Sequence, residues 1–267
     1  MQLKEFFKKI VGHDNIFMKA RGNYAIRDAL YCLNPDKSFK KILVPDQGGW
    51  LRYLDYPPKY GYVVENLKTD YGVIKPGELD EKSKDADVII YEEPAGYFAH
   101  QPIEEIYKIC KKNNCMVILD ITGSIGWLKN QGEFADVIIC SFGKAKPINL
   151  GYGGFFSTNE KFPELLLSKE DFDFSYTDLL TKNLSKLELR QKNLREKAVK
   201  IKADLKDYNV LYSEKDGINV IVAFDSLNEK EKIIKYCNSN NLEYTLCPRY
   251  IRVMRDAISI EIKKLDA

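Results

Sequence analysis

The chain has 267 residues, 45% of them hydrophobic, which is enough for one large domain with a smaller lobe. Its formal net charge of +2 argues against bulk electrostatic binding to nucleic acid or to an anionic membrane. Because no apolar run is long enough to span a bilayer and residues 1–11 lack a signal-peptide core, we expect a cytoplasmic protein. The six cysteines form no C-x-x-C pair, which favours reduced thiols, and the two histidines are too few for a His-based metal site.

The first 170 residues alternate between helical and strand patterns. Apolar residues at helical spacing predict helices, at 3–11, 23–33, 102–113 and 162–168. Short apolar runs predict strands, at 41–45, 60–65, 87–93, 116–120, 136–142 and 153–158. Because the two kinds of element alternate, we expect right-handed crossovers, and therefore an α/β fold with a mostly parallel sheet sandwiched by helices.

The pattern changes in the last third of the chain. From about Thr177 to Asp207 the sequence is polar and free of Gly and Pro, which predicts one long connecting helix. A small C-terminal α+β lobe should follow, with strands at 219–224, 243–246, 250–254 and 258–262 and a helix at 228–240. The predicted organisation is an N-terminal arm, a large domain, the connecting helix and a small domain, at 1–13, 14–170, 171–208 and 209–267.

The segment from Ala135 to Thr158 is the most informative part of the sequence. It reads as a buried strand, a Ser at the strand's end, two lysines, a glycine-rich turn and a second apolar strand. This order can place an amine beside an anion site at the edge of a sheet. The spaced residues are Ser141, Phe142, Lys146, Gly151, Gly153 and Gly154.

This spacing resembles the lysine segment of fold-type I enzymes that use pyridoxal 5'-phosphate (PLP). The segment is most similar to that of the DegT/StrS sugar aminotransferases, in a shortened chain. The match at every spaced position makes Lys146, rather than Lys144, the candidate for the Schiff base with the cofactor. A buried amine flanked by positive charge has a lowered pKa and can attack an aldehyde.

The resemblance also implies cofactor-binding residues. Asp120 ends a buried strand and is the candidate acid that keeps the pyridine nitrogen protonated. Ser141 and the turn at Gly22 and Asn23 are the phosphate candidates, since a helix N-terminus offers free N–H donors. Trp50 is the candidate to cover the ring, with Tyr53 as a weaker one. Readings that need no ligand stay open, because an Asp often caps a turn and a Trp often lies in a core.

Substrate contacts are less defined. The loop at 93–102 resembles the family's Gly-Gln-Pro loop with His100 in place of the Gly, so His100 is a candidate contact. Arg252 is a candidate for binding a carboxylate, although Arg249 and Arg255 are also available. The family commonly has a Gln three residues after the Asp, whereas this chain has Gly123.

The resemblance implies a PLP-dependent aminotransferase-type enzyme that acts through Lys146 on an amino acid or an amino/keto sugar. Two alternatives stay open. One is a PLP lyase or desulfurase of the same fold, for which Cys247 is the only cysteine in a plausible place. The other is a non-catalytic fold-type I scaffold that serves as a binding subunit. Fold-type I sites are usually completed by a second subunit, which implies a homodimer.

Overall fold

The computed structural model describes residues 3–160 and 171–265. Its helices are α1 (Leu3–Val11), α2 (Gly22–Leu33), α3 (Arg52–Asp55), α4 (Pro76–Lys82), α5 (Ile103–Lys112), α6 (Thr177–Leu184), α7 (Leu187–Asp204) and α8 (Leu227–Ser239). Its strands are β1 (Asn15–Lys19), β2 (Lys41–Pro45), β3 (Val63–Leu67), β4 (Thr69–Asp70), β5 (Val73–Ile74), β6 (Val88–Glu92), β7 (Met116–Asp120), β8 (Val137–Ser141), β9 (Gly154–Thr158), β10 (Asn209–Val210), β11 (Val220–Ala223), β12 (Tyr244–Cys247) and β13 (Ala257–Ile260). The helix predicted at 162–168 lies outside the described residues. No helix within the described ranges is long and apolar enough to cross a membrane.

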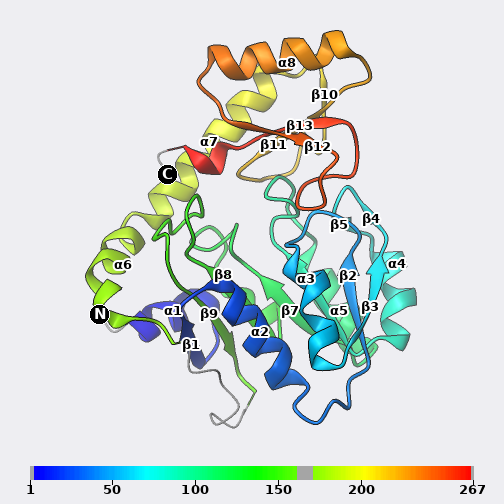
Figure 1. Ribbon diagram of the computed structural model, residues 1–267, viewed down its shortest axis with the longest axis vertical. Helices are drawn as coiled ribbons and strands as arrows, with labels where there is room; N and C mark the ends of the chain where they lie inside the picture. Colours follow the sequence, from blue (N-terminus) through cyan, green and yellow to red (C-terminus); the bar gives the residue numbers. More distant parts are fainter. Residues whose placement is uncertain (1–2, 161–170, 266–267) are drawn as a thin grey trace.

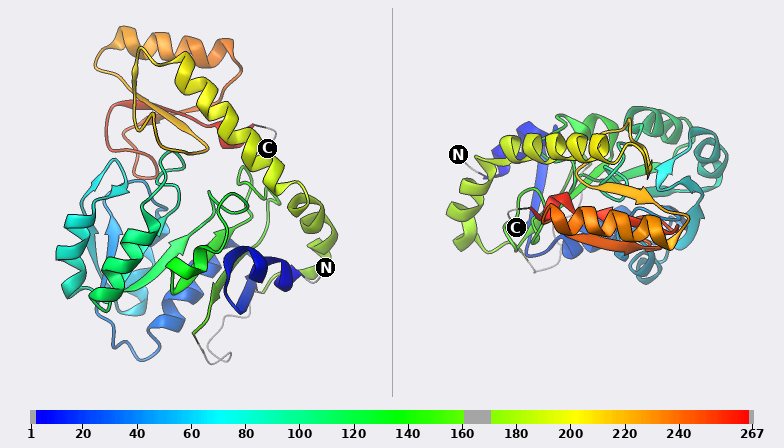
Figure 2. Two further views of the ribbon diagram at one scale, coloured as in Figure 1. Left: turned by 180° about the vertical axis from the view of Figure 1, so that it is seen from behind. Right: turned by 90° about the horizontal axis from the view of Figure 1, so that it is seen from above.

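Two lobes make up the molecule. Figure 1 shows a larger lobe, coloured blue to green, below a smaller lobe coloured yellow to red. The helices α6 and α7 run along one side of the molecule and connect the lobes, as the view from behind in Figure 2 also shows. The two lobes correspond to the large domain and the small α+β lobe expected from the sequence.

A seven-stranded sheet in the order β1-β9-β8-β7-β6-β2-β3 forms the centre of the large lobe. Neighbours among β8, β7, β6, β2 and β3 pair in parallel. The strand β9 is antiparallel to both β8 and β1. The mostly parallel α/β sheet predicted from the alternating pattern is therefore confirmed.

Helices cover both faces of this sheet, and the strands are apolar on both sides for that reason. Ile118 in β7 packs in the same cluster as Ala25 and Ile26 of α2. Its neighbours Val117 and Leu119 pack on the opposite face, in the cluster that holds α1 and α5. Since alternate residues of a strand point to opposite faces, the last residue of β7 lies on the α2 face.

The small lobe has a four-stranded antiparallel sheet in the order β10-β11-β13-β12. Val220 and Val222 of β11 pack against α7 and α8 on one face of this sheet. Ile221 and Ala223 point the other way and pack with Phe98 of the large lobe. The side chains on one face of β11 therefore pack in the core of the small lobe, and those on its other face pack in the contact between the lobes.

The secondary structure differs from the sequence prediction in several places, including the short elements α3, α4, β4, β5 and β10, which were not predicted. The long connecting helix is two helices, because α6 packs Leu180 and Leu184 on the large lobe whereas α7 packs Leu194 in the small lobe. The predicted strand at 250–254 is wrong, since this segment forms a tight loop closed by a hydrogen bond from Arg249 N to Val253 O (2.8 Å). The edge strand β1 was not predicted.

The loop from Glu93 to His100 contacts the small lobe through its backbone. The carbonyl oxygen of Tyr97 accepts hydrogen bonds from the backbone N–H groups of Ile218 (2.8 Å) and Asn219 (2.9 Å). Gly217 lies so close that a Cβ there would be 2.3 Å from the carbonyl oxygen of Phe98. Direct backbone contact therefore fixes this loop against the small lobe.

Substitution of Phe98 by Ala tests how much the lobe contact stabilises the chain. Phe98 is fully buried, and its truncation leaves a cavity between the lobes, so we expect the free energy of unfolding to fall by about 3–5 kcal/mol. Urea unfolding followed by circular dichroism measures this. Val199→Ala on the exposed side of α7 is the control and should change stability by less than about 0.5 kcal/mol. Equal effects of the two substitutions would contradict the packing role.

Candidate active site

Three polar side chains end three neighbouring parallel strands. Glu92 ends β6, Asp120 ends β7 and Ser141 ends β8. Glu92 and Asp120 are paired in the β6–β7 register, and Asp120 is paired with Ile139 two residues before Ser141. By the alternation of the strands, all three side chains lie on the α2 face of the sheet. They meet at the carboxyl edge, where α/β sheets bind ligands.

The start of α2 lies directly against Ser141. A Cβ at Gly22, the first residue of the helix, would lie 2.5 Å from Ser141 Cβ and 2.8 Å from Ser141 Oγ. Only glycine permits this approach. The Arg21 side chain at the N-cap makes no capping hydrogen bond. The helix N-terminus, with its dipole and its first N–H groups, therefore faces the Ser141 hydroxyl.

Trp50 is tied to the same helix. Its indole N–H donates to Asn23 Oδ1 (2.9 Å). This bond uses Asn23, one of the residues predicted to bind the phosphate. Tyr53, one turn further on, is fully buried and donates its hydroxyl proton to Asp120 Oδ2 (2.5 Å). The two aromatic residues predicted for one role thus have different contacts.

Lys146 lies in the glycine-containing turn after β8. Its backbone N–H donates to Gly143 O (3.2 Å), and Ala145 before it adopts a left-handed conformation with a φ of 59°. Its amine donates to the Tyr97 hydroxyl and lies 5.6 Å from the Trp50 ring centroid. Lys144 is exposed and does not line the pocket.

These residues surround one pocket. Its lining residues are Gly22, Asn23, Ile26, Trp50, Glu92, Tyr97, Asp120, Thr122, Ile139, Cys140, Ser141 and Lys146. A second, more open hollow shares the Gly22, Trp50, Ser141 and Lys146 walls and adds Arg21 and Tyr152.

Burial shifts the ionisation of the charged groups in the pocket. It lowers the pKa of Lys146, and Arg252 lowers it further, while Glu92 and Asp120 act to raise it. Burial also raises the pKa of Asp120, against hydrogen bonds from Thr122 and Tyr53 that favour the carboxylate. Burial and the neighbouring Asp120 raise the pKa of Glu92 to about 7. Shifts of this kind are typical of functional sites.

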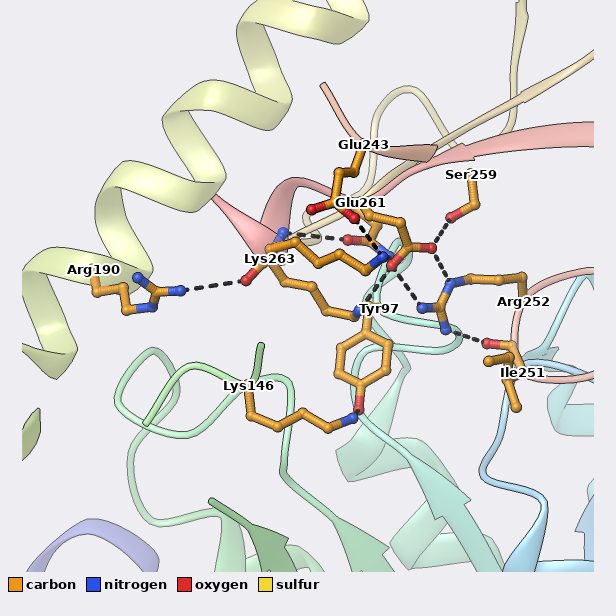
Figure 3. A network of polar contacts seen from close by, with 11 residues as sticks. Tyr97, Lys146, Arg190, Glu243, Ile251, Arg252, Ser259, Glu261 and Lys263 are labelled. Carbon is orange, nitrogen blue, oxygen red and sulfur yellow. Dashed lines mark hydrogen bonds and ion pairs between the residues drawn. The ribbon is translucent and has the colours of Figure 1, made fainter. Parts of the chain in front are cut away.

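A second group of charges lies behind Tyr97, on the small-lobe side (Figure 3). Arg252 makes a bidentate ion pair with Glu261, with contacts of 2.9 Å from Nε and 2.8 Å from Nη2. Lys263 also bonds Glu261 (2.7 Å). The Tyr97 ring lies between these cations and the Lys146 amine, with centroid distances of 5.2 Å to Arg252, 5.0 Å to Lys263 and 4.5 Å to Lys146.

The structure brings most of the predicted cofactor residues together but separates the predicted substrate contacts from them. Gly22, Asn23, Trp50, Asp120, Ser141 and Lys146 all line the pocket. His100 lines a different hollow and bonds Glu93 (2.5 Å). The Arg252 guanidinium is occupied by Glu261. Both substrate roles stay predictions.

Sequence reasoning missed Glu92, Tyr97 and Thr122. Glu92 ends an apolar strand as Asp120 does, so the same signal was present. Thr122 accepts a hydrogen bond from the backbone N–H of Ser141 (2.9 Å) and links two strand ends, which no local pattern reveals. The sequence indicates only that Tyr97 lies in a loop. Its contacts come from both lobes, so no local pattern reveals them.

The donor set of the pocket fits PLP. The cofactor needs an amine, an acid, donors for a phosphate and a flat cover. Lys146, Asp120, Ser141 with the start of α2, and Trp50 offer these in that order, within one pocket. Among the described residues, no cluster of three His, Cys, Asp or Glu side chains could hold a metal ion.

Comparison with family models gives two matches. Residues 67–165 match the DegT/DnrJ/EryC1/StrS aminotransferase family. Residues 181–267 match the MJ1341 family C-terminal domain. The curated proteins give no match to this chain.

Comparison with solved structures gives consistent neighbours. A serine palmitoyltransferase variant from S. paucimobilis, with PLP and myriocin bound, has a TM-score of 0.75 at 15% identity. The match covers 96% of this chain and 69% of the transferase chain. A NifS-like protein has a TM-score of 0.76 at 16% identity, and the match covers 96% of this chain and 80% of the NifS-like chain. An alanine–glyoxylate aminotransferase from Nostoc sp. has a TM-score of 0.70 at 13% identity, covering 99% and 82%.

Identities this low establish a shared fold and nothing further. The resemblance found in the lysine segment is confirmed at that level. The chain has the fold of fold-type I PLP enzymes, and its residues 67–165 resemble the DegT/DnrJ/EryC1/StrS aminotransferases.

Proposed function

We propose that the chain is a PLP-dependent aminotransferase-type enzyme that uses Lys146 to act on an amino acid or an amino/keto sugar. The observation that carries the proposal is the position of the Lys146 amine. It lies in one pocket with the Asp120 carboxylate and with the donors at Gly22 and Ser141. A lysine on the surface would have none of these neighbours.

Each pocket residue has a defined task under this proposal. PLP, when bound, supplies an aldehyde, an electron-accepting ring and a phosphate anchor. The Ser141 hydroxyl and the N–H groups at the start of α2 bind the phosphate. Asp120 holds a proton at the pyridine nitrogen, and Trp50 covers the ring. Because burial lowers its pKa, Lys146 can be a neutral amine, able first to attack and later to move a proton at the substrate Cα.

The desulfurase alternative is less well supported. A desulfurase needs a mobile, reactive thiolate, and reactive thiols have lowered pKa values. Cys247 is only 7% exposed, and burial raises its pKa. A PLP lyase of the same fold would share Lys146 and Asp120, so only its products distinguish it from a transferase. The scaffold alternative predicts no specific reaction at Lys146.

The substrate contacts and the oligomeric state also belong to this proposal. Arg252 can bind a substrate carboxylate only after Glu261 releases it, since the two now form a bidentate pair. His100 would contact a substrate only if the substrate extends beyond the pocket. The homodimer implied by the family resemblance and the cytoplasmic location expected from the sequence also stay predictions. Light scattering of the purified chain tests the homodimer.

Labelling with PLP tests the proposal directly. Purified protein is mixed with PLP, reduced with borohydride and digested for peptide mapping. We expect a visible absorbance band before reduction and one phosphopyridoxyl label on Lys146 after it, because this amine is desolvated and lies beside the phosphate donors. Lys146→Ala should lose the label, whereas Lys144→Arg should keep it. Random labelling of surface lysines, without a preference for Lys146, would reject the enzyme proposal.

Substitution of Asp120 by Asn separates cofactor capture from turnover. The amide keeps the shape of the carboxylate but cannot hold a positive charge at the ring nitrogen. We expect Lys146 to be labelled as in the wild type, while amino transfer from a panel of amino donors falls roughly a hundredfold or more. Asp178→Asn on the exposed surface of α6 is the matched control and should leave turnover unchanged. Full turnover in the Asp120→Asn variant would show that this carboxylate has another role.

A further inference from the structure

The Tyr97 hydroxyl contacts the Lys146 amine in the pocket. Lys146 Nζ donates a hydrogen bond to this hydroxyl and lies 4.5 Å from the centroid of the Tyr97 ring. Within the described ranges the amine makes no other hydrogen bond. Tyr97 is 4% exposed and lines the same pocket as Asp120 and Ser141. A molecule that reacts with the amine must therefore come to lie beside this hydroxyl.

The backbone of Tyr97 has a conformation that bulky residues seldom adopt. Its φ is 70°, in the left-handed region. Its N–H donates to Pro94 O (3.0 Å), and its carbonyl oxygen accepts from the N–H groups of Ile218 and Asn219. Strained residues persist only where their surroundings fix them, and they cluster at functional sites. Backbone contacts from both lobes therefore fix where the Tyr97 side chain enters the pocket.

Gly123 leaves room for the Tyr97 ring. A Cβ at position 123 would lie 2.6 Å from Pro94 Cδ and 3.1 Å from Tyr97 Cδ1. A larger residue at this position, such as the Gln that the family commonly has, would displace the loop. The glycine is therefore matched to a loop that brings the Tyr97 hydroxyl to the Lys146 amine.

Two other polar groups of the pocket already have partners. The Asp120 carboxylate accepts hydrogen bonds from the Tyr53 hydroxyl (2.5 Å) and the backbone N–H of Thr122 (2.9 Å). The Trp50 N–H donates to Asn23 (2.9 Å).

The Tyr97 hydroxyl accepts from Lys146 and also carries a proton of its own, which burial retains because it raises the pKa of Tyr97. A tyrosine hydroxyl can both accept and donate. Tyr97 can therefore donate to an acceptor that arrives beside the Lys146 nitrogen.

We propose that Tyr97 binds the ring oxygen next to the aldehyde of the cofactor, and so makes Lys146 selective for aldehydes that carry a neighbouring hydroxyl group. On capture, the lysine nitrogen forms a double bond to the aldehyde carbon. Its two hydrogens and the aldehyde oxygen leave as water, so nothing is oxidised or reduced. In PLP a ring hydroxyl stands on the carbon adjacent to the one that bears the aldehyde. Its oxygen therefore lies close to the captured nitrogen, within reach of the Tyr97 hydroxyl.

The charges on the far side of the Tyr97 ring favour binding of an oxygen that bears negative charge. Arg252 and Lys263 lie 5.2 Å and 5.0 Å from the ring centroid, on the small-lobe side (Figure 3). These two cations share the single negative charge of Glu261. The remaining positive charge favours an anionic oxygen at the hydroxyl, and hydrogen bonds to ionised acceptors are the stronger ones.

The inference rests on the proposed function for the identity of the aldehyde. Its test compares PLP with 3-deoxypyridoxal 5'-phosphate, which lacks only the ring hydroxyl. Each is titrated into the wild type and Tyr97→Phe, and borohydride reduction with peptide mapping gives the fraction captured at Lys146. We expect Tyr97→Phe to weaken capture of PLP roughly ten- to hundredfold, and capture of the deoxy compound by less than about twofold. An equal loss for the two ligands would mean that Tyr97 has only a structural role, and would overturn the proposal.

Tyr91→Phe is the matched control. It also removes a buried hydroxyl, but this one lies in the core on the other face of the sheet and has no hydrogen-bond partner among the described residues. Both ligands should be captured by this variant as by the wild type.

The visible absorbance band of captured PLP gives a second readout, because its position depends on the ionisation of the ring oxygen. We expect the band to shift in Tyr97→Phe and to stay in place in Tyr91→Phe. A band at the wild-type position in Tyr97→Phe would contradict the contact.

A second pair of aldehydes separates this inference from the proposed function. Salicylaldehyde and benzaldehyde differ by the same hydroxyl but lack the phosphate and the ring nitrogen of PLP. The wild type should prefer salicylaldehyde at Lys146 by a larger factor than Tyr97→Phe does, and the intrinsic effect of the hydroxyl cancels in this comparison. If that holds while PLP gives no label, the proposed function fails and the Tyr97 contact stands. If PLP labels Lys146 equally in both proteins, the contact fails and the function stands.

Discussion

The position of Tyr97 is a constraint on which much of the rest of the site depends. Its carbonyl oxygen is held by two backbone N–H groups of the small lobe, and its hydroxyl contacts the Lys146 amine of the large lobe. Its ring separates Lys146 from Arg252 and Lys263. A change in how the lobes meet must therefore change the surroundings of the amine. The small lobe and the Lys146 amine are therefore connected directly, because Tyr97 by itself contacts both.

Burying so many charges is costly unless each has a partner, and the pairing explains the arrangement of the site. Glu261 neutralises Arg252 and is also bonded by Lys263, and these two cations hold its pKa well below the usual range. On the other side of Tyr97, Lys146 lies near Glu92 and Asp120. Burial and the neighbouring Asp120 raise the pKa of Glu92 to about 7. Ion pairs therefore hold Arg252, Glu261 and Lys263 in their charged forms, whereas the protonation of Glu92 in the pocket can change near neutral pH.

Local sequence signals were sufficient for the bounds of β2 and β7, because an apolar run is a property of neighbouring residues. Lys146 rather than Lys144 lines the pocket, and its chemical role stays a prediction. The failures involve contacts that the local pattern does not contain. The segment at 250–254 has a strand-like alternation, yet it forms a loop closed by the hydrogen bond from Arg249 N to Val253 O, and its Arg252 side chain pairs with Glu261. The role of Tyr97 was equally hidden, since position 97 meets Gly123, Lys146 and Ile218 only in the folded chain.

The boundary of the C-terminal family match does not coincide with the boundary between the hydrophobic cores of the two lobes. The C-terminal match begins at residue 181, inside α6. Yet Leu184 and Leu187, which follow, still pack in the core of the large lobe, and the small lobe's own core takes over only from Leu194. The C-terminal segment therefore carries part of the large lobe's packing with it, together with the Arg252, Glu261 and Lys263 charges. Since those charges lie against Tyr97, sequence differences in this segment can alter the reactivity of Lys146 without changing any residue of the pocket itself.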